Sequence, residues 1–369
     1  MRFDRRLLFH FDWVLLLLVL SICAISLLNM YSAGGSLLTA KGDPIYIKQF
    51  IWFLIGLVMM AVCFGIDYRL INEYAYVIYS FTIVLLLILF SMGELTRGTQ
   101  RWFVIGGFSF QPSELAKLSL ILALSRFFNM NETEEGYKLR QLWIPFVLTL
   151  VPFLLIMKQP DLGSAMVLII VFVSMVFFIG IKWRSVLLVV TSGLSLMPVA
   201  WHFLKDYQKE RILTFLNPEL DPLGAGYHII QSIIAIGSGG VFGKGFLKGT
   251  QSQLRFLPEH QTDFIFSVFA EEWGFVGGLI LLILFLCLTF WGLRIARQSR
   301  DLLGTLMAFA ITIMIFWEVF INIGMVLGIL PVVGIPLPFF SYGGSSLVIL
   351  MMGIGLLMNI SMRRFMLQP

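Results

Sequence analysis

The chain has 369 residues, of which 59% are hydrophobic and 13% are charged, with a net charge of +5. Its mean hydropathy is +0.91. A soluble globule of this length needs more polar surface than this composition supplies, so the soluble fold classes are excluded. The composition indicates an integral membrane protein.

About ten apolar segments recur along the chain, each long enough to cross the hydrocarbon of a bilayer as a helix. In chain order they are Trp13 to Met30, Phe50 to Ile66, Tyr74 to Met92, Pro112 to Phe128, Leu142 to Met157, Leu162 to Ile181, Ser185 to Trp201, Phe264 to Leu293, Leu302 to Leu330, and Ser341 to Met362. No internal repeat or soluble domain separates them. The sequence therefore predicts an all-α integral membrane protein with a single polytopic domain over residues 1–369.

The N-terminal stretch MRFDRRLLFHFD precedes an apolar run and resembles a secretory signal. Because many further spans follow, an uncleaved signal anchor is the favoured interpretation. The basic residues of short loops and tails gather on one side if the N-terminus is cytoplasmic. Both termini are therefore predicted to be cytoplasmic, and the one long connection, 202–263 between spans seven and eight, to be extracytoplasmic.

Most of the unusual ionisable residues fall on the predicted outer side. In FQPSELAK, Glu114 and Lys117 are three residues apart in the first two turns of the fourth span, so they share one side of a helix. Asp161 and Asp263 stand at the outer starts of the sixth and eighth spans, and Arg101 lies in an outer loop. Separate connections thus bring carboxylates and cations to one membrane surface.

Each of these residues also has a purely structural interpretation. Glu114 and Lys117 could form a buried ion pair, because an unpaired charge inside a bilayer is costly. Asp161 precedes an apolar helix, where a carboxylate caps free N–H groups, and capping is the favoured interpretation there. Capping explains Asp263 less well, because the neighbouring Thr262 could cap by itself.

Further polar residues flank or enter the eighth and ninth spans. Glu259 and His260 add polarity beside Asp263 that no cap requires, and together with Asp161 they are candidates for tuning its surroundings or holding the loop. Glu271, Glu272 and Glu318 are intramembrane carboxylates that need partners, and a structural role is favoured for them.

The long connection contains an amphipathic segment. From Tyr227 onwards, HIIQSIIAIG places apolar residues on one side and Gln and Ser on the other, a pattern typical of an interfacial helix. The glycines that follow permit tight turns close to a substrate. A lid over the site is the favoured interpretation, and simple tethering between distant spans is the alternative. The proline-rich VVGIPLPFFSYGG predicts a rigid turn over the same cavity.

Carboxylates at helix mouths with cations beside them suit an anionic substrate carried by lipid. The sequence has no GxxxxGK[ST] motif, so it lacks that cradle for a soluble nucleotide. On the extracytoplasmic side the substrate must arrive already activated. A polyprenyl diphosphate sugar meets these conditions.

Several stretches also carry a family resemblance. They are RWFVIGGFSFQPSELAK, KQPDLGSA, the long GYHIIQSIIAIGSGGVFGKGFLKGTQSQLRFLPEHQTDFIF with AEE after it, and NIGMVLGILPVVGIPLPFFSYGGSS. Together they resemble the SEDS family of bacterial shape, elongation, division and sporulation proteins, and are more similar to its elongation branch than to its division branch. The match runs from the first span to the last.

The resemblance implies a peptidoglycan glycosyltransferase that polymerises lipid II at the outer face of the cytoplasmic (inner) membrane during elongation and rod-shape maintenance. It implies a class B penicillin-binding protein, a transpeptidase, as partner, together with other membrane proteins of the elongation complex. No nucleic-acid partner is expected.

The resemblance also assigns roles to individual residues. The family's essential Asp falls on Asp263, the candidate general base, and its Glu and Lys pair falls on Glu114 and Lys117. Arg101, Lys117 and Arg211 are the candidates for binding the diphosphate. A divalent cation, Mg²⁺ or Mn²⁺, could assist them, although no cofactor is certain. The family pattern does not predict an acid at Glu318.

Two other functions fit the same sequence. A lipid II flippase would also have many spans and intramembrane charges, but its charges are expected at both leaflets. A non-catalytic scaffold of the synthetic complex would tolerate loss of Asp263. The bias of the charges toward the outer side favours chemistry there.

Overall fold

The structure, a computed structural model, describes residues 11–34, 44–92, 101–105, 108–133, 136–182, 225–253 and 261–364, with isolated positions between 187 and 214. Its helices are α2 (Trp13–Ala33), α3 (Ile45–Gly65), α4 (Tyr68–Glu73), α5 (Ala75–Met92), α6 (Pro112–Met130), η1 (Leu139–Leu142), α7 (Trp143–Lys158), α8 (Leu162–Ile179), α11 (Ala225–Gly239), α12 (Thr250–Gln253), α13 (Ile265–Gln298), α14 (Leu302–Val326) and α15 (Gly344–Arg363). Every expected span coincides with one of these helices except 185–201, of which only isolated positions are described.

Among the described residues, 7 helical segments are long and apolar enough to cross a membrane: α2, α3, η1 together with α7, α8, α13, α14 and α15. The described part of α5 is a shorter apolar helix, and α6 contains Glu114, Lys117 and Arg126. The prediction of an all-α membrane protein is confirmed, whereas the number of spans stays a prediction.

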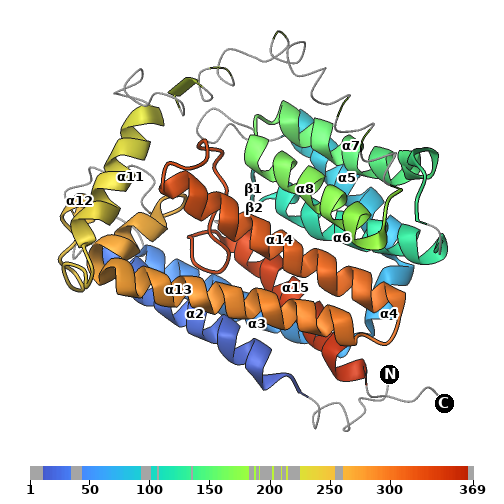
Figure 1. Ribbon diagram of the computed structural model, residues 1–369, viewed down its shortest axis with the longest axis horizontal. Coiled ribbons are helices and arrows are strands. Elements are labelled where there is room, and N and C mark those ends of the chain that lie inside the picture. The colour runs from blue at the N-terminus through green and yellow to red at the C-terminus, as the bar shows by residue number, and fades with distance from the viewer. Residues whose placement is uncertain are drawn as a thin grey trace.

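Helices α14 and α15 form the centre of the bundle and are buried over most of their length. The group α5 to α8 packs on one side of them, and α2 and α3 lie on the other (Figure 1). The outer helices expose many apolar side chains, which suits a hydrocarbon solvent. Helices α11 and α12 lie at the end of the bundle opposite to the end where α2 begins and α15 stops (Figure 1).

Aspartates define the start of several helices. The side chains of Asp12, Asp67, Asp161 and Asp301 accept hydrogen bonds from backbone N–H groups in the first turns of α2, α4, α8 and α14. Such caps satisfy N–H groups that have no partner inside the helix. The capping interpretation of Asp161 is therefore correct as far as the local geometry goes.

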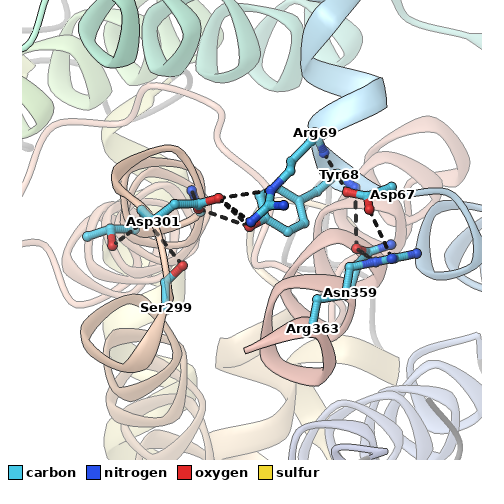
Figure 2. Close-up of polar contacts among 9 residues, drawn as sticks. Asp67, Tyr68, Arg69, Ser299, Asp301, Asn359 and Arg363 are labelled. Carbon is cyan, nitrogen blue, oxygen red and sulfur yellow. Dashed lines mark hydrogen bonds and ion pairs between the residues drawn. The ribbon is translucent and has the colours of Figure 1, made fainter. Parts of the chain in front are cut away.

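A polar cluster ties four segments together at the end of the bundle where α15 stops (Figure 2). Asp301 accepts hydrogen bonds from the Tyr68 hydroxyl and forms an ion pair of 2.8 Å with Arg69. Arg363 pairs with Asp67 at 2.9 Å, and the Asn359 amide donates to the main chain at the end of α3. Burial and the Asp301 carboxylate raise the pKa of Tyr68, so its phenol stays protonated and donates.

A short antiparallel hairpin is an addition to the expected all-helical architecture. Strands β1 (Phe103–Ile105) and β2 (Phe108–Phe110) pair with Phe103 opposite Phe110 and Ile105 opposite Phe108. Two triplets rich in phenylalanine, FVI and FSF, separated by Gly-Gly are a hairpin signal that the sequence carries. The hairpin leads directly into α6 and so helps to position the first turn of that helix.

Helix α13 is interrupted two turns after its start, at Gly274, which has φ 66° and ψ −164°. The loop after α11 fills the break. The N–H groups of Lys244 and Gly245 donate to the carbonyls of Glu271 and Glu272, while those of Phe275 and Val276 donate to Gly240 and Val241. The main-chain groups freed by the break are thus satisfied by a second segment of backbone, as a membrane protein requires.

The contact between this loop and the break requires glycine. At Gly243, φ is 78° and a Cβ atom would lie 2.1 Å from the carbonyl oxygen of Glu272. We expect Gly243→Ala to destabilise the protein by roughly 1–3 kcal/mol or more, because both the backbone conformation and the contact are strained. Gly237→Ala is the matched control, since a Cβ atom there would meet no other segment of the protein within 4 Å. Thermal unfolding in detergent measures both, and equal midpoints for the two variants would contradict the prediction.

Candidate functional site

Asp263 lies in the turn before α13, and its side chain is partly exposed. The N-cap residue of α13 is Phe264, and no side chain forms a capping hydrogen bond there. Asp263 precedes this N-cap residue and so lies outside the helix. Its Oδ2 atom faces Gly334, where a Cβ atom would lie 3.5 Å away. The carboxylate therefore sits against the proline-rich loop that connects α14 to α15.

The same loop contacts the start of α8. A Cβ atom at Gly163 would lie 2.7 Å from the carbonyl oxygen of Val333. The loop thus separates Asp263 from the first turn of α8, where Asp161 caps the helix. Asp161 also accepts a hydrogen bond of 3.0 Å from the Gln111 amide, at the start of α6. The starts of α6, α8 and α13 therefore meet around one loop.

Arg101 joins this region from the segment before β1. Its Nε donates to the carbonyl of Gln159 at 2.9 Å, and its Nη2 donates to the carbonyl of Pro160. The guanidinium is partly exposed and lies beside the turn that leads to Asp161. Two of its donors therefore hold the main chain of this turn.

Glu114 and Lys117 form the ion pair that their spacing predicts, with 2.8 Å between the Lys117 Nζ and a Glu114 oxygen. A third residue completes the group, because the same Nζ lies 2.5 Å from Glu318 Oε1 on α14. All three side chains are 3% exposed or less. Two carboxylates share one ammonium, and the three residues, the buried triad, join α6 to α14.

The partner of Glu318 could not be predicted from the sequence. It is 201 positions from Lys117 along the chain. No periodicity within one span indicates which residue of another span faces it. The one available signal was its charge, because an acid deep in an apolar helix requires a partner.

Glu271 and Glu272 find partners in the loop that fills the break of α13 and at α2. Glu271 accepts hydrogen bonds from Lys244 Nζ at 2.7 Å and from the Thr250 N–H at 2.8 Å, while Ser32 donates to Glu272. The structural interpretation of these two acids agrees with these contacts.

The amphipathic segment of the long connection is helical as α11, and its buried face carries both polar and apolar side chains. Ser232 is fully buried, donates to the carbonyl of Val326 and shares a hydrogen bond with Ser267. Ile233 and Ile234 are exposed instead. The face that carries Ile229, Ser232 and Ala235 therefore packs against the bundle, with its contacts to α13 and α14.

Three of the predicted site residues lie outside the described residues: Arg211, Glu259 and His260. Their proposed contacts stay predictions. Within the described ranges no three His, Cys, Asp or Glu side chains gather in a way that could hold a metal ion. The divalent cation considered from the sequence stays a prediction.

The chain matches the cell cycle protein family FTSW_RODA_SPOVE over residues 12–365. It is 44% identical to the peptidoglycan glycosyltransferase MrdB of Escherichia coli strain K12 over 359 residues, which cover 97% of this chain and 95% of that protein.

Two solved structures share the fold over nearly the full length. One, described as a peptidoglycan synthase complex that coordinates polymerization and crosslinking, contains a chain 36% identical to this one, with a TM-score of 0.82 and coverage of 96% and 98%. The other is the rod shape determining protein RodA of Thermus thermophilus, 32% identical, with a TM-score of 0.71 and coverage of 96% and 98%.

Proposed function

Because the chain belongs to the FTSW_RODA_SPOVE family and is a peptidoglycan glycosyltransferase, we propose that Asp263 is the general base of its reaction, at the extracytoplasmic end of the bundle. The observation that carries the proposal is the position of Asp263. Its partly exposed carboxylate lies outside the helix start, against a loop that also contacts α8.

The reaction joins two lipid-linked disaccharides. The 4-hydroxyl of the acceptor GlcNAc attacks the anomeric carbon of the donor, and the bond from that carbon to the lipid diphosphate breaks. Asp263 takes the hydroxyl proton as the new glycosidic bond forms, and the diphosphate departs with the electron pair. Attack opposite to the leaving group inverts the anomeric carbon in one displacement.

The leaving diphosphate needs positive charge. Arg101 is partly exposed and lies beside the turn that leads to Asp161, so it is the favoured candidate among the described residues. Lys117 is held between Glu114 and Glu318. We therefore assign it the structural role of fixing α6 against α14. Arg211 remains a further candidate from the long connection.

The substrate in this proposal is lipid II, and the partner is a class B penicillin-binding protein. Support for the partner comes from the related peptidoglycan synthase complex, in which polymerization and crosslinking are coordinated. The outward orientation rests on the basic residues of the short cytoplasmic loops. Elongation is the favoured process, given the similarity to MrdB and RodA.

Reconstitution tests the activity against its alternatives. The purified chain with its partner is given labelled lipid II in detergent, and products are separated by gel electrophoresis. We expect glycan polymer, because detergent micelles have no second compartment and only an enzyme produces polymer there. A preparation that moves lipid II across vesicles but forms no polymer indicates a flippase. Polymer formed by the partner alone indicates a scaffold.

A further inference from the structure

Three consecutive carbonyl groups, at Asp263 and the two residues before it, are each held by a donor that lies at least 59 positions further along the chain. The carbonyl of Gln261 accepts from the Tyr342 N–H at 2.9 Å, and that of Thr262 accepts from the Ser341 hydroxyl at 2.6 Å. The carbonyl of Asp263 accepts from the Asn322 amide at 3.0 Å. The backbone that carries the proposed base is therefore fixed residue by residue.

Asn322 differs from the other two donors because it bridges two segments. Its Nδ2 donates to Asp263 and also, at 2.7 Å, to the carbonyl of Ile335 in the proline-rich loop. The side chain is fully buried, and its Oδ1 has no partner among the described residues. Both acceptors are carbonyls, so the amide acts here only as a double donor.

The helix that presents Asn322 is itself anchored. Glu318 precedes Asn322 by four residues and therefore lies one turn away on the same side of α14. Its ion pair with Lys117 holds that side of α14 against α6. The ion pair therefore fixes the part of α14 that carries Asn322. The second acceptor of Asn322, Ile335, directly follows Gly334, which is the residue that Asp263 Oδ2 faces.

From this geometry we infer that Asn322 is a positioning residue for Asp263: it fixes the proposed base relative to the loop it faces. The inference rests on the proposed function of Asp263. A base must lie within hydrogen-bond reach of the hydroxyl it deprotonates, and a small displacement of its backbone lowers the rate of the chemical step. Binding of lipid II involves other groups, so loss of Asn322 is expected to change kcat and to leave KM unchanged.

The test replaces Asn322 by Leu, which has a similar size and no donor. We expect kcat for labelled lipid II to fall on the order of 100-fold with KM unchanged, as for loss of alignment in the chemical step. Asn322→Ser, which keeps one hydroxyl donor, is expected to lie between this variant and the parent. It also provides the same test if the Leu variant is not recovered folded.

Asn72→Leu is the matched control. Asn72 is also buried and donates to a main-chain carbonyl, that of Leu122 at 3.0 Å, but it lies in α4 at the opposite end. We expect its variant to lose stability and keep kcat. A parental kcat in Asn322→Leu, or an equal kcat loss in Asn72→Leu, overturns the inference. If Asp263→Asn is active, the proposed role of Asp263 as general base is wrong. If Asp263→Asn is inactive and Asn322→Leu is fully active, only the role of Asn322 is wrong.

Discussion

Asp263→Asn is expected to lower the rate of glycan polymerisation by about 10²- to 10⁴-fold, the range that general base catalysis contributes. The amide has nearly the same shape as the carboxylate but cannot accept the hydroxyl proton. Because Asp263 stands before the N-cap of α13, the substitution removes no cap and the fold is expected to persist. The measurement is polymer formed from labelled lipid II by equal amounts of folded complex.

Asp67→Asn is the matched control for this substitution. Asp67 caps α4 and pairs with Arg363 at the opposite end of the bundle (Figure 2). Asparagine caps a helix about as well as aspartate, so polymerisation is expected to be unchanged. Parental activity in Asp263→Asn would show that this carboxylate is not the base, even if the chain polymerises lipid II.

Charge and local pattern predicted much of the architecture. The apolar segments predict the helices because each span must satisfy its own backbone hydrogen bonds. The spacing of Glu114 and Lys117 predicts their contact, since residues three apart share one side of a helix. The position of Asp161 before an apolar run predicts its cap in the same local way.

Contacts between distant segments could not be predicted from these rules. Glu318 and Asn322 lie in an apolar run whose pattern does not show which neighbours they face. The break at Gly274 was likewise not predicted, because Gly277 and Gly278 follow in the same segment and a glycine alone does not show at which position a helix is interrupted. Its cause is the docking of the loop at Gly243, and that pairing depends on the tertiary structure.

Lys117→Met is expected to be the most destabilising substitution in the buried triad, by about 3–5 kcal/mol or more. It leaves Glu114 and Glu318 facing each other in a nearly water-free interior without the ammonium that they share. Glu318→Gln is expected to cost far less, because one carboxylate and one ammonium still balance and the amide oxygen still accepts from Nζ. Thermal unfolding in detergent and the yield of inserted protein measure both.

Arg69→Met provides the exposed comparison. Its pair with Asp301 also has a distance of 2.8 Å, but the two side chains are 37% and 29% exposed. Such a pair is worth about 0–1 kcal/mol, because water screens it. A Lys117→Met variant as stable as Arg69→Met would show that the triad carries no uncompensated charge when its cation is removed.

Neutralising the whole triad separates its structural role from a chemical one. In the variant Glu114→Gln, Lys117→Met and Glu318→Gln, no charge remains between α6 and α14, so most of the stability lost in Lys117→Met is expected to return. If polymerisation returns with the stability, the triad acts only by holding α14, and with it Asn322, in place. If the folded variant stays inactive, the charges of the triad contribute to the reaction itself, and the purely structural role proposed for Lys117 is wrong.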